Sequence, residues 1–263
     1  MQLRLSRRVA LAGAAAFTLF AAAMVPGVAL ANDSKSGPPK PTVVLVHGAW
    51  ADSSSWDAVM TRLRADGYPV RAIADPLQGL TSDSAYLSSY LATIKGPVVL
   101  VGHSYGGAVI TNAATSDPDV KSLVYIAGFI PVTGETVGDL AGRTSPSLPL
   151  VYTPVPGGTE VSIDPAHFRE AFAGDVDADT AANLAAAQRP ANTRAVTDPS
   201  VGEAFRTIPS WDLITLQDHA IAPDVQRFMA ARAHAHVSEV KAAHAVMVSR
   251  PGAVTKIIEQ AAR

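Results

Sequence analysis

The chain has 263 residues, no cysteine, and a formal net charge of −2 at pH 7. The absence of cysteine excludes a disulfide framework and a thiol nucleophile. The near balance of 21 Lys and Arg with 23 Asp and Glu argues against nucleic acid or an anionic membrane surface as a partner.

Residues 1–31 have the pattern of an export signal. Three arginines precede an uncharged, alanine-rich run that ends in the cleavage-like tripeptide Ala29-Leu30-Ala31. The run is long enough to be a membrane anchor, but Pro26 interrupts it, which favours removal. The pair Arg7-Arg8 resembles a twin-arginine signal, and the Sec route stays open.

The remaining chain divides into a short linker and one domain. Residues 32–41, rich in Ser, Gly, Lys and Pro, are expected to be a flexible linker. Residues 42–263 are long enough for one α/β domain with a single core. We expect a secreted or periplasmic monomer or homodimer, without membrane contact once the signal is removed.

Apolar runs alternate with helical patterns from residue 42 onward. The expected strands are Thr42–Val46, Val70–Ala74, Val98–Val101, Leu123–Ala127, Leu213–Leu216 and His236–Val240. The expected helices are Ser55–Ala65, Asp83–Ile94, Gly107–Thr115, His167–Phe172, Asp179–Ala187, Pro223–Ala233 and Ala253–Ala262. Such an alternation predicts βαβ crossovers and a doubly wound, mostly parallel sheet.

One segment, about 129–209, interrupts this alternation. It is rich in proline and glycine and is too long for a loop in a compact domain. We therefore expect an inserted helical cap over the carboxyl edge of the sheet, where ligands of open α/β sheets bind. Its Phe129, Phe168 and Phe172 are expected to line a substrate pocket together with Tyr105.

The strand at 98–101 runs directly into Gly102-His103-Ser104-Tyr105-Gly106, a G-x-S-x-G motif, and then into a helix. In a sharp strand-to-helix turn the serine hydroxyl is exposed at the sheet edge above a helix N-terminus. The motif also occurs by chance in ordinary glycine-rich turns. Its position between a strand and a helix favours Ser104 as a nucleophile.

An acid and a histidine follow at positions suited to assist the serine. Asp218 comes after the strand at 213–216, and His244 comes after the strand at 236–240. The order Ser104, Asp218, His244 is the order of the catalytic triad in α/β-hydrolases. In it the histidine accepts the serine proton and the acid orients the histidine.

Other acids compete with Asp218. Asp212 lies at the start of its strand, and Asp224 opens a helix after Pro223. Glu135, which follows an earlier strand, is the more serious alternative.

The other histidines do not form a metal pattern. His103 lies inside the serine motif and is expected to face away from the hydroxyl. His219, His234 and His236 have spacings that match no zinc site. We expect neither a metal nor a cofactor.

A second turn, His47-Gly48-Ala49-Trp50, follows the strand at 42–46. It is expected at the same sheet edge as the serine turn. The N–H groups of Ala49 and Tyr105 could then form an oxyanion hole, in which each donor contributes about 3 kcal/mol. His47 is expected to hold this loop rather than to react.

Taken together, these motifs resemble the α/β-hydrolases, specifically a bacterial branch similar to plant hydroxynitrile lyases and methyl-ester esterases. The matching residues are His47-Gly48-Ala49-Trp50, Gly102–Gly107, Ala127–Pro131, Gln217–Ile221 and His244. The resemblance implies Ser104, His244 and Asp218 as the triad, with the amides of Ala49 and Tyr105 as oxyanion donors.

Two departures from the lyases bear on the chemistry. Those enzymes have a threonine at the position of Gly48 and a lysine at the position of Ala245, which bind and release cyanide. Their absence favours hydrolysis of a small-molecule carboxylic ester. The alternatives are lyase-like or cofactor-free haloperoxidase activity on the same fold, and a non-catalytic ligand-binding module.

Overall fold

The computed structural model describes residues 39–263. The expected export signal, residues 1–31, lies outside the described residues, as do residues 32–38 of the expected linker. Within the described part, no helix is long and apolar enough to cross a membrane.

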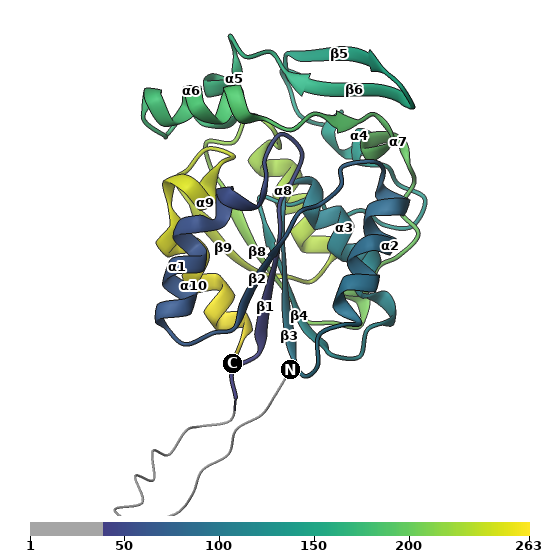
Figure 1. Ribbon diagram of the computed structural model, residues 1–263, viewed down its shortest axis with the longest axis vertical. Helices are drawn as coiled ribbons and strands as arrows, with labels where there is room; N and C mark the ends of the chain where they lie inside the picture. The colour runs from purple at the N-terminus through teal and green to yellow at the C-terminus, as the bar shows by residue number, and fades with distance from the viewer. Residues whose placement is uncertain (1–38) are drawn as a thin grey trace, which may run out of the picture. The chain divides into compact units, whose positions relative to one another are not determined.

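Within residues 39–263, all the strands expected outside the insertion form one parallel sheet (Figure 1). In chain order they are β1 (Thr42–Val46), β2 (Val70–Ile73), β3 (Val98–His103), β4 (Val120–Ile126), β8 (Ser210–Thr215) and β9 (His236–Val240). Their order across the sheet is β2-β1-β3-β4-β8-β9. The chain thus winds outward in both directions from β1 and β3, which confirms the predicted doubly wound α/β fold.

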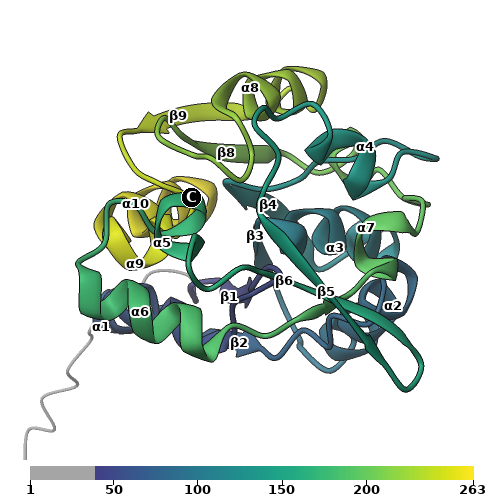
Figure 2. The same ribbon diagram turned by 90° about the horizontal axis from the view of Figure 1, so that it is seen from above.

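Helices cover both faces of this sheet (Figure 2). One face packs against α2 (Leu80–Leu91), α3 (Tyr105–Ala113) and α8 (Pro223–Arg232). The other packs against α1 (Asp57–Ala65), α9 (Val246–Ser249) and α10 (Pro251–Ala261). Short 3₁₀ turns lie at Ser53–Trp56, Ala114–Ser116 and Ala204–Arg206.

Strand β1 explains why both layers are needed. Val44 and Val46 belong to the core cluster of the first face, whereas Val43 and Leu45 belong to that of the second. Successive side chains of a strand point to opposite faces, so a continuous apolar run buries both. Strands β1 and β3 therefore contain unbroken runs of Val and Leu.

The sequence predicts a helical cap between β4 and β8, but this insertion contains strands as well as helices. It contains α4 (Val137–Ala141), α5 (Phe168–Phe172), α6 (Ala178–Ala187), α7 (Arg194–Thr197), β5 (Leu150–Val155), β6 (Gly158–Ile163) and β7 (Ala191–Asn192). The three strands form an antiparallel sheet of order β5-β6-β7. Figure 1 shows β5, β6, α5 and α6 above the carboxyl ends of the main strands.

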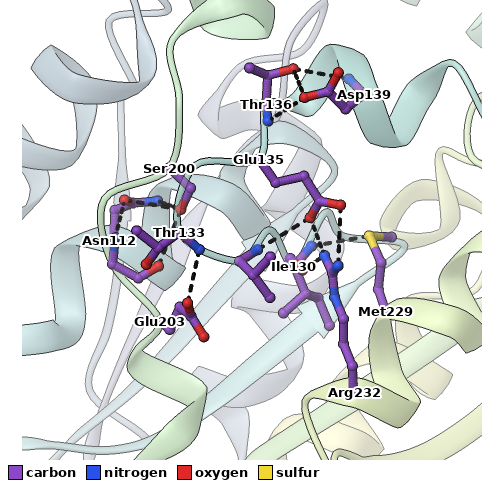
Figure 3. Close-up of polar contacts among 12 residues, drawn as sticks. Asn112, Ile130, Thr133, Glu135, Thr136, Asp139, Ser200, Glu203, Met229 and Arg232 are labelled. Carbon is purple, nitrogen blue, oxygen red and sulfur yellow. Dashed lines mark hydrogen bonds and ion pairs between the residues drawn. The ribbon is translucent and has the colours of Figure 1, made fainter.

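The two ends of the insertion are bound to each other and to the main layers. Gly134 N–H donates to the Ser200 carbonyl at 2.8 Å, and Thr133 N–H donates to Glu203 Oε1 at 2.9 Å (Figure 3). Asn112 of α3 accepts the N–H of Gly202 at 2.9 Å. The insertion is therefore anchored at its base by these hydrogen bonds.

One buried carboxyl in the main sheet has no compensating contact. Asp212 in β8 is 0% exposed, and neither of its oxygens has a hydrogen-bond partner among the described residues. Burial raises the pKa of this carboxyl well above its usual range, because the charged form is poorly solvated there. Asp212 is therefore a source of instability that ionisation would increase.

Replacing Asp212 by Asn should change how stability depends on pH. Because the pKa is raised in the folded state, wild-type stability falls as pH rises above the unfolded carboxyl's pKa of about 3.9, by about 1.4 kcal/mol per pH unit until the folded pKa is reached. In urea unfolding at pH 4.0, 5.5 and 7.0, the free energy of unfolding of Asp212→Asn minus that of the wild type should increase as pH rises. Exposed Asp66→Asn is the control, and a gap that does not change with pH would contradict the expectation.

Candidate active site

The turn between β3 and α3 holds Ser104 in an unusual backbone conformation. Its φ is +52° and its ψ is −122°, a region that disfavours residues with a β-carbon. The turn is also crowded, since a β-carbon added to Gly106 would lie 2.7 Å from the Val46 carbonyl oxygen. Glycine at this position lets β1 approach the turn, as the G-x-S-x-G motif requires.

The structure brings Ser104, His244 and Asp218 together. Ser104 Oγ lies 2.8 Å from His244 Nε2, and His244 Nδ1 lies 2.7 Å from Asp218 Oδ2. His244 is completely buried, and Ser104 and Asp218 are each 4% exposed. The three side chains form one hydrogen-bonded line from the serine hydroxyl to the carboxylate, with the order and the locations at strand ends that the sequence predicted.

Two residues outside the predicted site hold Asp218 in place. Thr215 Oγ1 donates to Asp218 Oδ2 at 2.6 Å, and Gln226 Nε2 donates to the same oxygen at 3.0 Å. The other oxygen accepts the N–H groups of Ala220 and Ile221 at 2.8 and 2.9 Å. The sequence could have indicated Thr215, because it ends the same strand only three residues before the acid. Gln226 lies in the middle of α8, and nothing in the sequence marked it as buried.

The alternative acids do not reach His244. Glu135 is turned toward Arg232 of α8, whose Nη1 lies 3.2 Å from its Oε1 (Figure 3). It also accepts the N–H of Val132 at 3.2 Å. Asp212 is buried without a hydrogen-bond partner, and Asp224 is exposed in the first turn of α8. Glu135 thus fastens the start of the insertion to the main layers.

His103 supports His244 from behind. Its Nε2 donates to the His244 carbonyl at 3.1 Å, and the two rings pack with centroids 4.7 Å apart. Burial lowers the pKa of His103 well below its usual range, so the ring is neutral.

Within residues 39–263, no group of three or more His, Asp or Glu side chains is arranged to hold a metal ion. His219, His234 and His236 therefore form no such group.

The turn after β1 lies next to Ser104. A β-carbon added to Gly48 would lie 2.6 Å from Ser104 Cβ and 3.2 Å from Tyr105 N. Neither the Ala49 N–H nor the Tyr105 N–H has a hydrogen-bond acceptor within residues 39–263. Both N–H groups thus belong to the two turns that meet beside Ser104, and neither has an acceptor among the described residues.

An apolar cavity of about 200 Å³ opens at Ser104. Ala49, Trp50, Tyr105 and Phe129 line it, together with side chains of the insertion such as Val161. No charged residue is among the lining residues that the structure describes. The cavity is smaller than the roughly 300–1,000 Å³ of sites for drug-sized ligands.

The expectation that Phe168 and Phe172 line the cavity is wrong. Both belong to a separate buried cluster, and the Phe172 ring lies 4.8 Å from that of His244. Ala245, at the position of the lyase lysine, lies in the same cluster. Phe172 therefore packs behind the histidine and Phe168 packs against Phe172, whereas Phe129 and Tyr105 line the cavity as predicted.

A doubly wound sheet with a strained serine turn at a central strand end defines the class of α/β-hydrolase folds. Comparison with known proteins agrees with this class. The sequence model of the alpha/beta hydrolase family matches residues 43–257, and the chain belongs to this family.

The similar proteins are named as esterases and hydrolases. A carbendazim hydrolyzing esterase of Nocardioides is 32% identical over 116 residues, which cover 39% of this chain and 48% of that protein. A pyrethroid hydrolase of Sphingobium wenxiniae is 30% identical over 246 residues, covering 82% of this chain and 85% of the relative.

A solved structure extends this similarity to three dimensions. The crystal structure of a pyrethroid hydrolase from Sphingobium faniae JZ-2 matches with a TM-score of 0.69 and 26% identity, over 84% of this chain and 97% of that one. The predicted resemblance to α/β-hydrolases is confirmed, and the chain is an esterase-type hydrolase.

Substituting Thr215 by Val should weaken the support of Asp218. The change keeps the shape of the side chain but removes a buried hydrogen bond to a carboxylate, which costs about 1–3 kcal/mol. Urea unfolding at pH 7 measures this loss of stability. Thr93→Val is a matched control, because exposed Thr93 makes a hydroxyl bond of 2.7 Å to the Tyr90 carbonyl. Equal effects of the two substitutions would contradict the role assigned to Thr215.

Proposed function

We propose that this protein hydrolyses small, neutral carboxylic esters with Ser104 as nucleophile, His244 as base and Asp218 as the orienting acid. The observation that carries the proposal is the continuous hydrogen-bonded line from Ser104 Oγ to Asp218 Oδ2, with steps of 2.8 and 2.7 Å, at the end of an apolar cavity. Buried and pre-oriented groups of this kind are the basis of acyl transfer.

The proposed reaction has two halves. His244 Nε2 accepts the hydroxyl proton as Ser104 Oγ attacks the ester carbonyl, and the Ala49 and Tyr105 amides bind the resulting oxyanion. Collapse of the tetrahedral intermediate breaks the ester C–O bond, and His244 donates its proton to the departing alcohol. Water then attacks the acyl-enzyme, giving its proton to His244, and the acid leaves as Ser104 recovers its proton.

The cavity supports a neutral and compact substrate. Its described lining has no charged side chain, so an ionised group would lose its hydration without a partner. The relatives named for carbendazim and pyrethroids also support small-molecule substrates. Tyr152, which is 60% exposed and lines the cavity, lies where the cavity meets solvent.

Hydrolysis is favoured over cyanohydrin cleavage at two positions. A side chain at residue 48, where the lyases carry threonine, would collide with Ser104 Cβ at 2.6 Å. Ala245 is buried beside the cluster of Phe172 and supplies no cation for a departing cyanide.

We also propose that the enzyme acts outside the cytoplasm, with residues 1–31 as a cleaved export signal. The support is the sequence pattern of arginines, apolar run and Ala29-Leu30-Ala31. When the full chain is expressed in a bacterium with both export routes, N-terminal sequencing of the exported protein should begin at Asn32. Arg7→Lys with Arg8→Lys should abolish export if the route is twin-arginine. An uncleaved protein retained in the cytoplasm would overturn the proposal.

Ser104→Ala and His244→Ala should each lower kcat/KM for a p-nitrophenyl ester by at least about 1,000-fold, because the triad acts as a unit. A fluorophosphonate probe should label the wild type at Ser104 and leave Ser104→Ala unlabelled. Wild-type activity in either variant would show that the triad assignment is wrong. Assays of cyanohydrin cleavage and of halide-dependent oxidation on the same samples test the alternative reactions. A folded wild-type protein that the probe does not label would indicate a ligand-binding module instead.

An ester with a charged acyl group should be hydrolysed more slowly than a neutral ester of similar length. We expect p-nitrophenyl butyrate to be hydrolysed at least about tenfold faster than p-nitrophenyl hemisuccinate, whose carboxylate would be desolvated in the cavity. Intrinsic reactivity is controlled by comparing both rates with hydroxide-catalysed hydrolysis. Equal enzymatic rates for the two esters after this correction would contradict the inference that the cavity selects neutral acyl groups.

A further inference from the structure

Arg189, on the segment between α6 and β7, contacts the turn that carries Ala49. Its Nη1 donates to the Asp75 carbonyl at 3.1 Å and lies 3.4 Å from His47 Nε2. Its own carbonyl accepts the Trp50 N–H at 3.0 Å. One residue of the insertion therefore holds both the imidazole before Gly48 and the backbone just after Ala49.

The hydrogen bonds of His47 define which of its nitrogens carries the proton. Nε2 lies 3.0 Å from the Asp75 N–H, which can only donate, and it faces Arg189 Nη1, which also only donates. Nε2 must accept, so the proton is on Nδ1, which lies 2.9 Å from the Gly48 carbonyl oxygen. The side chain is fully buried, and burial lowers its pKa to about 4, which keeps the ring neutral.

This proton fixes the direction of an oxyanion donor. The Gly48 carbonyl and the Ala49 N–H belong to the same planar peptide unit, and in a trans peptide they point in opposite directions. When His47 Nδ1 holds the carbonyl, the N–H is held on the other side of that plane. Trp50, the next residue but one after Gly48, has a φ of +63°, a strained conformation that its bond to the Arg189 carbonyl helps to maintain.

We propose that Arg189 is a positioning residue for the oxyanion hole: its Nη1 reinforces the Asp75 N–H as a donor to His47 Nε2, which holds the imidazole against the Gly48 carbonyl and so keeps the 48–49 peptide aligned for catalysis. The inference rests on the proposed esterase function, because the Ala49 N–H matters only if an oxyanion forms beside Ser104. It also makes the insertion part of the catalytic apparatus, since displacement of the 189–190 segment would release the oxyanion loop.

Arg189 is placed to affect the transition state rather than substrate binding. It is not among the described residues that line the cavity, so its removal should leave ground-state contacts intact. A planar guanidinium can also serve two acceptors at once, which a lysine ammonium does less well. The expected order of activity is therefore wild type, then Arg189→Lys, then Arg189→Met.

The test compares Arg189→Met with the wild type, using Arg194→Met as the matched control. Arg194 belongs to the same insertion, but its exposed side chain pairs with Asp198. With p-nitrophenyl acetate, Arg189→Met should lower kcat by about tenfold or more, as expected for a misaligned oxyanion donor, while KM changes by less than about twofold. A trifluoromethyl ketone, which forms an oxyanion on the serine, should lose affinity by a similar factor. Arg194→Met should match the wild type in all three measurements.

The ¹⁵N spectrum of His47, assigned with His47→Gln, provides a readout that does not depend on activity. The wild type should show the Nδ1–H form, and Arg189→Met, which leaves the Asp75 N–H as the donor to Nε2, should move the Nε2 resonance toward that of a nitrogen with one hydrogen bond. Unchanged kcat and an unchanged His47 spectrum in Arg189→Met, or a change in KM alone, would overturn the inference.

If Arg189→Met does not fold, Arg189→Lys decides, and wild-type kcat and inhibitor affinity in that variant would overturn the inference. A wild type without Ser104-dependent hydrolysis would instead remove the proposed function, and the ¹⁵N spectrum would still test the role of Arg189 in holding His47.

Discussion

The backbone of Ser104 adopts a φ of +52°, which costs a residue with a β-carbon about 1–3 kcal/mol. Its surroundings maintain this conformation. The Ser104 carbonyl accepts the N–H groups of Gly107 and Phe129 at 2.9 and 3.0 Å, and its own N–H donates to the Ile126 carbonyl at 3.2 Å. The strained turn is thus tied to α3 and to the end of β4. Because β1 and β4 flank β3 in the sheet, the position of the serine depends on the whole central sheet.

The insertion contributes to the site in more than one way. It supplies apolar side chains such as Val161 to the cavity, and Phe172 packs behind His244. It also contacts the loop of Ala49, where Trp50 Nε1 donates to the Val161 carbonyl at 3.0 Å. These contacts come from several parts of the insertion, so the cavity, the histidine and the oxyanion loop share one structural support. If the insertion only covered the sheet, the groups around the serine would not depend on the position of the insertion.

The sequence predicted the main layers closely because their physical signals are local. Buried parallel strands appear as uncharged Val and Leu runs, and β1 is such a run and has the predicted bounds. The edge strand β9 also has the predicted bounds, although it is largely exposed. The helix boundaries were predicted less closely than the strand boundaries. Helix α2 begins at Leu80 rather than at Asp83, because Asp83 lies inside the helix and accepts the N–H groups of Gln78 and Gly79 and the Tyr105 hydroxyl. The sequence does not reveal that this carboxylate accepts hydrogen bonds from the backbone of the turn that precedes it.

The insertion shows where local signals failed. Strand β5 is largely exposed and contains Pro154, so its sequence has neither a continuous apolar run nor a clean alternation, and its pairing with β6 depends on the Pro156-Gly157 turn. By itself, the sequence determined the parallel sheet, the serine turn and the strand ends from which an acid and a histidine would meet it. Only the tertiary structure decided that Asp218 rather than Glu135 reaches His244, that Gln226 of α8 holds that acid, and that Arg189 touches the oxyanion loop. The physical reason is distance along the chain: these contacts join residues that are far apart in sequence or lie on different elements, and packing alone decides which side chains meet.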